Sequence, residues 1–192
     1  YTADQGYFLG EHNYIDKRWM YEESLRMPFL VRYPQEIKPR TESDDIIINP
    51  DFAPLFLDYA NQQTPKDMQG KSFRKILAGK KEQNWRQSMY YRYWLHTTRP
   101  AHYGVRTKKH KLIFFYGLPL GMNGADWGPT KVGWELYDLE KDPKEMRNVY
   151  NDPAYKGIQK ELKAELLKLK ADLKDTDEKY PELMEVRKKY WD

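Results

Sequence analysis

The chain reads Lys-Leu-Ile-Phe-Phe-Tyr at residues 111–116, an apolar and aromatic run that is typical of a β-strand. Three similar runs lie around it, at residues 89–95, 103–107 and 134–139. Because the four runs follow one another at short spacing, we expect an antiparallel sheet. Apolar residues then recur at helical spacing over 155–173, with lysines and glutamates between them, which predicts an amphipathic helix lying on the sheet.

The N-terminal part of the chain predicts shorter elements. Asn-Pro-Asp at 49–51 is a good helix start, with a capping residue, a proline and an acid in the first turn. Residues 52–59 continue it with apolar side chains at helical spacing. A second short helix is expected at 73–78, ended by Gly79, and a short buried strand at 29–33.

Composition excludes several classes of protein. The 192 residues are 40% apolar and 15% aromatic, which argues against disorder. The net charge of +4 is spread along the chain, and lysines at 160–174 alternate with acids, so a solvated helix face is expected there and no nucleic-acid partner. There is no cysteine, hence no disulfide or thiolate chemistry, and no apolar run long enough to span a membrane.

The first residues hold a candidate metal site. Asp4 and Gln5 stand before Gly6, at the end of an apparent strand, where open α/β sheets place their sites. A carboxylate beside an amide carbonyl suits a hard cation such as calcium, although the same residues could form a simple polar turn. The start at Tyr1 has no methionine and no signal-like region, so we expect the chain to begin within a longer protein.

Several stretches resemble, in order, the second half of the type I sulfatases, the formylglycine-dependent family. They are Tyr1 to Tyr7 with Leu9 to His12, Lys17, Tyr21-Glu22 and Arg26 to Pro28; Asn49 to Asn61; Met68 to Phe73; and Glu135 to Leu139 with Asp142, Pro143 and Glu145. The resemblance extends to about residue 150. It implies an α/β fold, the alkaline-phosphatase-like sandwich, with residues 1–85 as the C-terminal part of the catalytic domain. Residues 86–192 would form a small antiparallel-sheet subdomain with a packed C-terminal helix.

In this family a formylglycine, made from the Cys or Ser of a C/S-x-P-S-R motif, attacks the sulfate ester as its hydrated gem-diol. The chain has no Cys, and neither Ser24 nor Ser43 is followed by Pro and Arg at that spacing. The resemblance therefore implies a missing N-terminal sulfatase portion that carries the formylglycine. We expect the isolated chain to be inactive.

The resemblance also implies roles for single residues. Asp4 and Gln5 would be calcium ligands; the family more often has Asn or His at the second position, and His would favour softer metals. Lys17 would contact the sulfate as a compact cation and take part in catalysis. His102, at the start of a strand, would bind the sugar. Structural roles are expected for His12, His96, His110, Arg26 and Arg106.

The expected function is thus hydrolysis of a sulfate ester on a sugar. The overall pattern most resembles bacterial sulfatases of glycosaminoglycan pieces, with N-acetylglucosamine-6-sulfate as the first choice of substrate, and the family implies a periplasmic or secreted location. One alternative is a non-catalytic C-terminal module that binds a partner or a sulfated glycan. Another is a phosphoester hydrolase of the same superfamily, against which Gln5 argues.

Overall fold

The computed structural model describes residues 1–96, 99–125 and 128–192, and the chain forms two compact units. The small unit contains residues 1–4 and 28–89, and the sheet unit contains residues 5–27 and 90–192. The chain passes from the small unit to the sheet unit at residues 89–90. The expected division into a catalytic part, 1–85, and a C-terminal subdomain, 86–192, stays a prediction. Residues 5–27 belong to the sheet unit although they come early in the chain.

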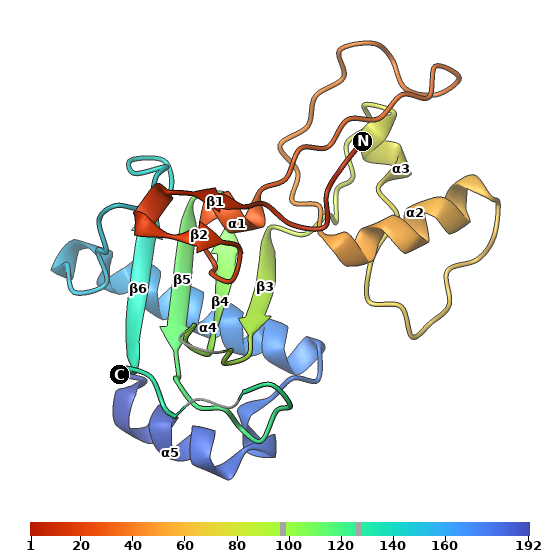
Figure 1. Cartoon of the computed structure of the whole chain (residues 1–192). Helices are drawn as coiled ribbons and strands as arrows, with labels where there is room; N and C mark the ends of the chain where they lie inside the picture. The colour runs from red at the N-terminus through yellow and green to blue at the C-terminus, as the bar shows by residue number, and fades with distance from the viewer. Residues whose placement is uncertain (97–98, 126–127) are drawn as a thin grey trace. The chain divides into compact units, whose positions relative to one another are not determined.

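The sheet has four strands in the order β3 (Ser88–Tyr93), β4 (His102–Thr107), β5 (His110–Phe115) and β6 (Gly133–Asp138), as Figure 1 shows. The pairs β4–β5 and β5–β6 are antiparallel, and Leu112 pairs with Val105 on one side and Leu136 on the other. The predicted antiparallel sheet is therefore confirmed.

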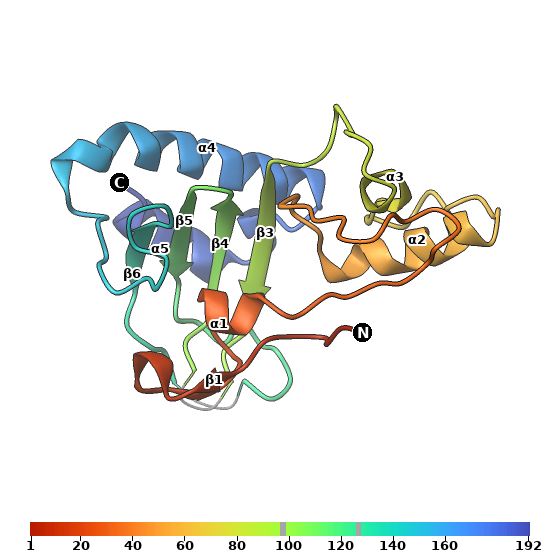
Figure 2. The same ribbon diagram turned by 90° about the horizontal axis from the view of Figure 1, so that it is seen from above.

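One face of the sheet, here the helix face, is covered by α4 (Lys156–Asp172), which lies across the strands (Figure 2). Leu162 and Leu166 of α4 join the core formed by Tyr103, Val105, Leu112, Phe114 and Leu136. The predicted amphipathic helix is confirmed. A second helix that the sequence analysis missed, α5 (Pro181–Tyr190), adds Leu183 to the same core. Short 3-10 turns, η3 (Pro153–Tyr155) and η4 (Asp177–Lys179), precede the two helices.

The opposite face, here the segment face, is covered by residues 5–27. This segment contains only short elements: β1 (Phe8–Leu9), η1 (Glu11–Asn13), β2 (Ile15–Asp16) and α1 (Glu22–Leu25). Its buried side chains pack with those of β5 and β6; the cluster is Phe8, Trp19, Met20, Tyr21, Ile113, Phe115 and Tyr137. Alternate residues of β5 thus point into two different cores, as the pleat of a strand requires.

The small unit is built on η2 (Asn49–Asp51), α2 (Phe52–Tyr59) and α3 (Arg74–Leu77). These confirm the predicted helices, and Gly79 follows α3 with a positive φ of 71°. Leu55, Phe73, Ile76, Leu77 and Trp85 form the core of this unit.

The buried strand predicted at 29–33 is wrong. Phe29 makes only an isolated bridge with Thr2, and Leu30, Val31 and Tyr33 are 67%, 42% and 36% exposed. An apolar run predicts burial only where a neighbouring element covers it. Here the cover is partial, because Tyr33 contacts Tyr59 of α2 while Leu30 and Val31 remain exposed. No helix among the described residues is long and apolar enough to cross a membrane.

Candidate functional site

Gln5 and Lys17, two of the predicted site residues, are brought together on the segment face. The Gln5 amide nitrogen donates to the Lys17 carbonyl oxygen at 3.0 Å and to the Ser24 hydroxyl at 2.9 Å. The Ser24 hydroxyl in turn donates to the same carbonyl. The amide of Gln5 is therefore oriented through its nitrogen, which leaves the oxygen as the end suited to a hard cation.

Gly6 makes this arrangement possible. Its N–H donates to the Ser24 carbonyl oxygen at 2.9 Å, so the chain at residue 6 lies directly against α1. A Cβ at this position would lie 2.1 Å from the carbonyl oxygen of Glu23 and 2.4 Å from that of Arg26. Only glycine permits so close an approach of two backbones.

Asp4 belongs to the small unit and is exposed. Its carbonyl oxygen accepts a hydrogen bond of 2.6 Å from the Asn49 side chain. Among the described residues no group of three or more His, Cys, Asp or Glu side chains could hold a metal. Asp4 and Gln5 have the oxygen donors that calcium prefers, but calcium takes six to eight ligands, so two residues would supply only part of a coordination shell. Their role as calcium ligands stays a prediction.

Lys17 is half-buried, and its main chain is fixed by the two hydrogen bonds to its carbonyl. The two residues on either side of Lys17, Asp16 and Arg18, form an ion pair with each other. The ammonium of Lys17 thus extends from a backbone whose position is determined by Gln5 and Ser24. A cation carried on a fixed backbone suits recognition of an anionic group, and the contact of Lys17 with sulfate stays a prediction.

His102 is completely buried on the segment face. Burial lowers its pKa to about 4, so the ring is neutral at pH 7, and Nδ1 lies 2.8 Å from the Pro100 carbonyl oxygen, to which it donates. Nε2 is buried and makes no hydrogen bond to the described residues. Aromatic rings surround the imidazole, with centroids 5.1 to 6.1 Å away: Trp19, Tyr91, Tyr93 and Phe115. The structure therefore offers no exposed surface of His102 to a ligand, and its contact with a sugar stays a prediction.

The sequence analysis missed Tyr91, which lies beside both His102 and Gln5. Burial raises the Tyr91 pKa to about 12 and outweighs the opposite effect of the neighbouring Gln5 side chain. An aromatic residue in a strand gives no signal of such a role, because the alternation of the strand alone does not show what faces it.

A buried ionic cluster, here the Lys111 cluster, lies on the same face of the sheet and consists of Glu22, Arg106, Lys111 and Glu145. The fully buried Lys111 Nζ is 2.8 Å from Glu22 Oε1 and 2.6 Å from Glu145 Oε1. Arg106 Nη2 is 3.0 Å from Glu22 Oε2, and the Glu22 N–H donates to Glu145 Oε2 at 2.7 Å. Burial opposes ionisation of Glu22, but the ion pairs with Lys111 and Arg106 outweigh it and lower its pKa to about 2.

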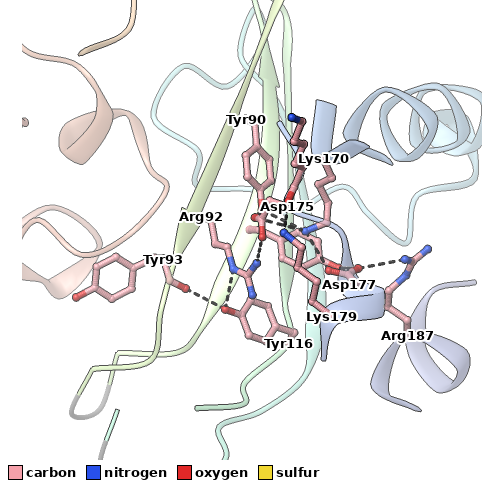
Figure 3. A network of polar contacts seen from close by, with 11 residues as sticks. Tyr90, Arg92, Tyr93, Tyr116, Lys170, Asp175, Asp177, Lys179 and Arg187 are labelled. Carbon is pink, nitrogen blue, oxygen red and sulfur yellow. Dashed lines mark hydrogen bonds and ion pairs between the residues drawn. The ribbon is translucent and has the colours of Figure 1, made fainter. Parts of the chain in front are cut away.

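A second buried cluster, here the Lys170 cluster, lies on the helix face (Figure 3). Asp177 accepts a hydrogen bond from Tyr103 Oη at 2.8 Å and pairs with Lys170 at 3.0 Å and Arg187 at 3.1 Å. The Lys170 ammonium also lies 3.8 Å from the centre of the Tyr103 ring. This cluster ties η4 and α5 to α4 and to the sheet, and it involves none of the predicted site residues.

Known proteins resemble this chain in both sequence and structure. Residues 10–172 match the family model described as N-sulphoglucosamine sulphohydrolase, C-terminal. An N-acetylglucosamine-6-O-sulfatase of Bacteroides thetaiotaomicron is 43% identical over 182 residues, which are 92% of this chain and 30% of that protein. The N-acetylglucosamine-6-sulfatase of Homo sapiens is 39% identical over 95 residues, 48% of this chain and 17% of that protein.

A similar solved structure, a protein in complex with its substrate D-glucosamine-2-N,6-O-disulfate, superposes with a TM-score of 0.83 and 42% identity, covering 92% of this chain and 34% of that one. This confirms the predicted α/β fold, since the structural neighbours include sulfatases of alkaline-phosphatase-like fold. The chain spans about a third of the length of the relatives that it matches over most of its own length. It belongs to the sulfatase family and corresponds to the C-terminal part of that family's proteins.

Proposed function

We propose that the chain is the C-terminal part of a calcium-dependent sulfatase that hydrolyses a sulfate ester on a sugar. The observation that carries this proposal is the 43% identity to an N-acetylglucosamine-6-O-sulfatase over 92% of the chain. That relative and the structural neighbour with bound disulfated glucosamine favour a glycosaminoglycan-derived substrate with a 6-O-sulfate on glucosamine.

In this proposal Lys17 binds the sulfate and stabilises the charge that develops on the leaving oxygen. Gln5 and Asp4 supply two oxygen ligands, and the calcium they help to hold would act as a Lewis acid on the sulfate. The hydrogen bonds from Gln5 and Ser24 to the Lys17 carbonyl support this assignment, because they couple a metal ligand to the sulfate-binding cation. The formylglycine nucleophile would come from the N-terminal portion of the whole protein.

His102 is proposed to serve the sugar subsite. A neutral ring whose Nδ1 donates to a carbonyl keeps Nε2 as an acceptor, which suits a sugar hydroxyl. Because the ring is buried, a hydroxyl would reach Nε2 only after a side chain such as Trp19 or Tyr91 moves aside. A periplasmic or secreted location remains a proposal from family membership.

The test compares the whole protein with the isolated 192-residue chain. We expect the whole protein to release sulfate from N-acetylglucosamine-6-sulfate, to lose this activity with a calcium chelator, and to regain it when calcium is added. We expect a formylglycine peptide in its mass spectrum and no turnover by the isolated chain. Turnover by the isolated chain, or a whole protein that binds sulfated glycans without hydrolysing them, would contradict the proposal, and the second result would favour the non-catalytic module.

A further inference from the structure

We propose that the Lys111 cluster is a positioning device that fixes the Lys17 ammonium and the Gln5 amide for the reaction. Lys111, Glu22, Glu145 and Arg106 would act through α1 and Ser24 and would not touch the substrate. This inference rests on the proposed function, because it assigns a purpose to residues around the proposed sulfate-binding lysine.

The contacts form a continuous path. Lys111 on β5 and Glu145 in the loop after β6 both hold Glu22, the first residue of α1. Two residues further along α1, the Ser24 hydroxyl is bonded to the Lys17 carbonyl and to the Gln5 amide, and its carbonyl accepts from Gly6. The position of α1 therefore determines the position of both candidate site residues.

The segment needs such an anchor. Its strands have two residues each and α1 has four, so its own backbone hydrogen bonds cannot hold a shape. Apolar packing of Met20 and Tyr21 buries the segment, but apolar contact is not directional and permits small shifts. Buried ion pairs hold their partners in place more strictly. Any shift separates a buried charge from its partner, and an unpaired charge in the protein interior is strongly destabilising.

Burial also decides between positioning and catalysis. Lys111 has no exposed surface and Glu145 is 2% exposed, so neither can reach a ligand. Glu22 is 9% exposed, and the ion pairs of its side chain are to Arg106 and Lys111 of the cluster. The cluster pairs two carboxylates with two cations, so it is electrically complete without a substrate or a metal.

The experiment replaces Lys111 by Met in the whole sulfatase and uses Lys170→Met as the matched control. Both lysines are fully buried, both pair with carboxylates, and they lie on opposite faces of one sheet. We expect Lys111→Met to lower kcat on N-acetylglucosamine-6-sulfate by roughly ten- to a hundredfold, because a small misplacement of a catalytic group has an effect of that size. KM should change by less than about threefold, because the lost interaction stabilises the transition state and contributes little to binding of the substrate in its ground state.

A second readout does not depend on activity. Amide hydrogen exchange of residues 17–24, measured by mass spectrometry, should become at least about tenfold faster in Lys111→Met than in Lys170→Met, because only the first loosens α1. If Lys111→Met does not fold, Arg106→Gln decides the matter, because it leaves the Lys111–Glu145 pair intact. We then expect a several-fold loss of kcat and faster exchange in the same peptide.

Equal kcat values for folded Lys111→Met and Lys170→Met, with equal exchange of residues 17–24, would overturn the inference while leaving the proposed function standing. A wild-type protein that shows no sulfatase activity would refute the proposed function instead. In that case unchanged exchange in the Lys111→Met protein would overturn the anchoring role as well, and faster exchange would support it.

Discussion

The two faces of the sheet both contain a buried ionic cluster, but the two clusters serve different purposes. Each face carries a fully buried lysine with carboxylate partners: Lys170 with Asp177 on the helix face, and Lys111 with Glu22 and Glu145 on the segment face. The helix face is covered by a helix of 17 residues with its own hydrogen bonds and apolar stripe. The segment face is covered by a chain of short turns that includes Gln5 and Lys17.

This difference shows what each cluster is needed for. A long amphipathic helix stays formed and buried by packing, so the Lys170 cluster mainly adds to the stability of the unit. A segment without long elements keeps its conformation only through side-chain bonds and close backbone contacts. Changes in the Lys170 cluster should therefore affect mainly unfolding, and changes in the segment that holds Gln5 and Lys17 should affect mainly the reaction.

The largest effect is expected from Lys17→Ala in the whole sulfatase. If Lys17 has its proposed role, loss of a cation that stabilises developing charge should reduce kcat/KM by roughly 10²- to 10³-fold. Lys17 is half-buried and outside both ionic clusters, so the melting temperature should change little. The measurement is steady-state kinetics on N-acetylglucosamine-6-sulfate together with thermal unfolding, and wild-type kinetics for the variant would remove Lys17 from the site.

On the helix face, we expect Asp177→Asn to lower stability and to leave the reaction unchanged. This change leaves Lys170 and Arg187 without their buried carboxylate and should lower the free energy of unfolding by about 3 kcal/mol. That corresponds to a fall in Tm of roughly 6–12 °C for a unit of this size. Calorimetry measures the effect, and kcat of the folded variant should equal that of the wild type. A large loss of kcat at temperatures well below Tm would show that the Lys170 cluster on the helix face also affects the reaction.

A smaller effect on both properties is expected from Gly6→Ala. The added methyl would meet two carbonyl oxygens of the 23–26 backbone, so the segment must shift, at a cost of about 1–3 kcal/mol. Because Gln5 immediately precedes Gly6, the shift should also displace the Gln5 amide, and activity should fall by about tenfold. The matched control is Gly157→Ala in α4, where the methyl meets no atom within 4 Å and should instead stabilise by about 0.5–1 kcal/mol. Similar unfolding curves for the two variants would contradict the close contact at Gly6.

The sequence predicted the regular parts of this chain better than the irregular ones. Runs such as 111–116 and the stripe of 155–173 have a periodicity that follows directly from strand and helix geometry. Helix α5 was missed because its buried face has few apolar residues, with Leu183 alone fully buried. The strand expected at 29–33 was wrong because an apolar run does not specify what covers it.

The site shows the same limit. Motif resemblance selected Gln5 and Lys17, but their contact depends on Ser24 and on a close approach at Gly6, which no spacing rule encodes. The partners of Lys111 lie far from it in the chain, on α1 and after β6. The sequence shows that a lysine within an apolar strand run is unusual, but it does not show which carboxylates pair with it. Long-range side-chain contacts of this kind require the fold.

The smallest effect is expected from Glu135→Gln on the segment face. Glu135 accepts hydrogen bonds from Tyr21 at 2.8 Å and Tyr137 at 3.0 Å, and burial raises its pKa despite them. An acid whose pKa is raised by folding binds its proton more tightly in the folded state. The wild type therefore loses stability as the pH rises from the unfolded pKa of about 4.3 through the raised value.

Gln can accept the same two hydrogen bonds without a charge to bury, so the variant should escape this loss. We expect Glu135→Gln to be more stable than the wild type by up to about 1 kcal/mol at pH 8, and the difference to disappear below about pH 3.5, where the carboxyl is protonated in both the folded and the unfolded state. Urea unfolding at a series of pH values measures it. A difference that stayed constant with pH would mean that Glu135 is not the titrating group. A variant less stable at pH 8 would mean that the two tyrosines stabilise the carboxylate by more than burial destabilises it, because charged acceptors form the stronger hydrogen bonds.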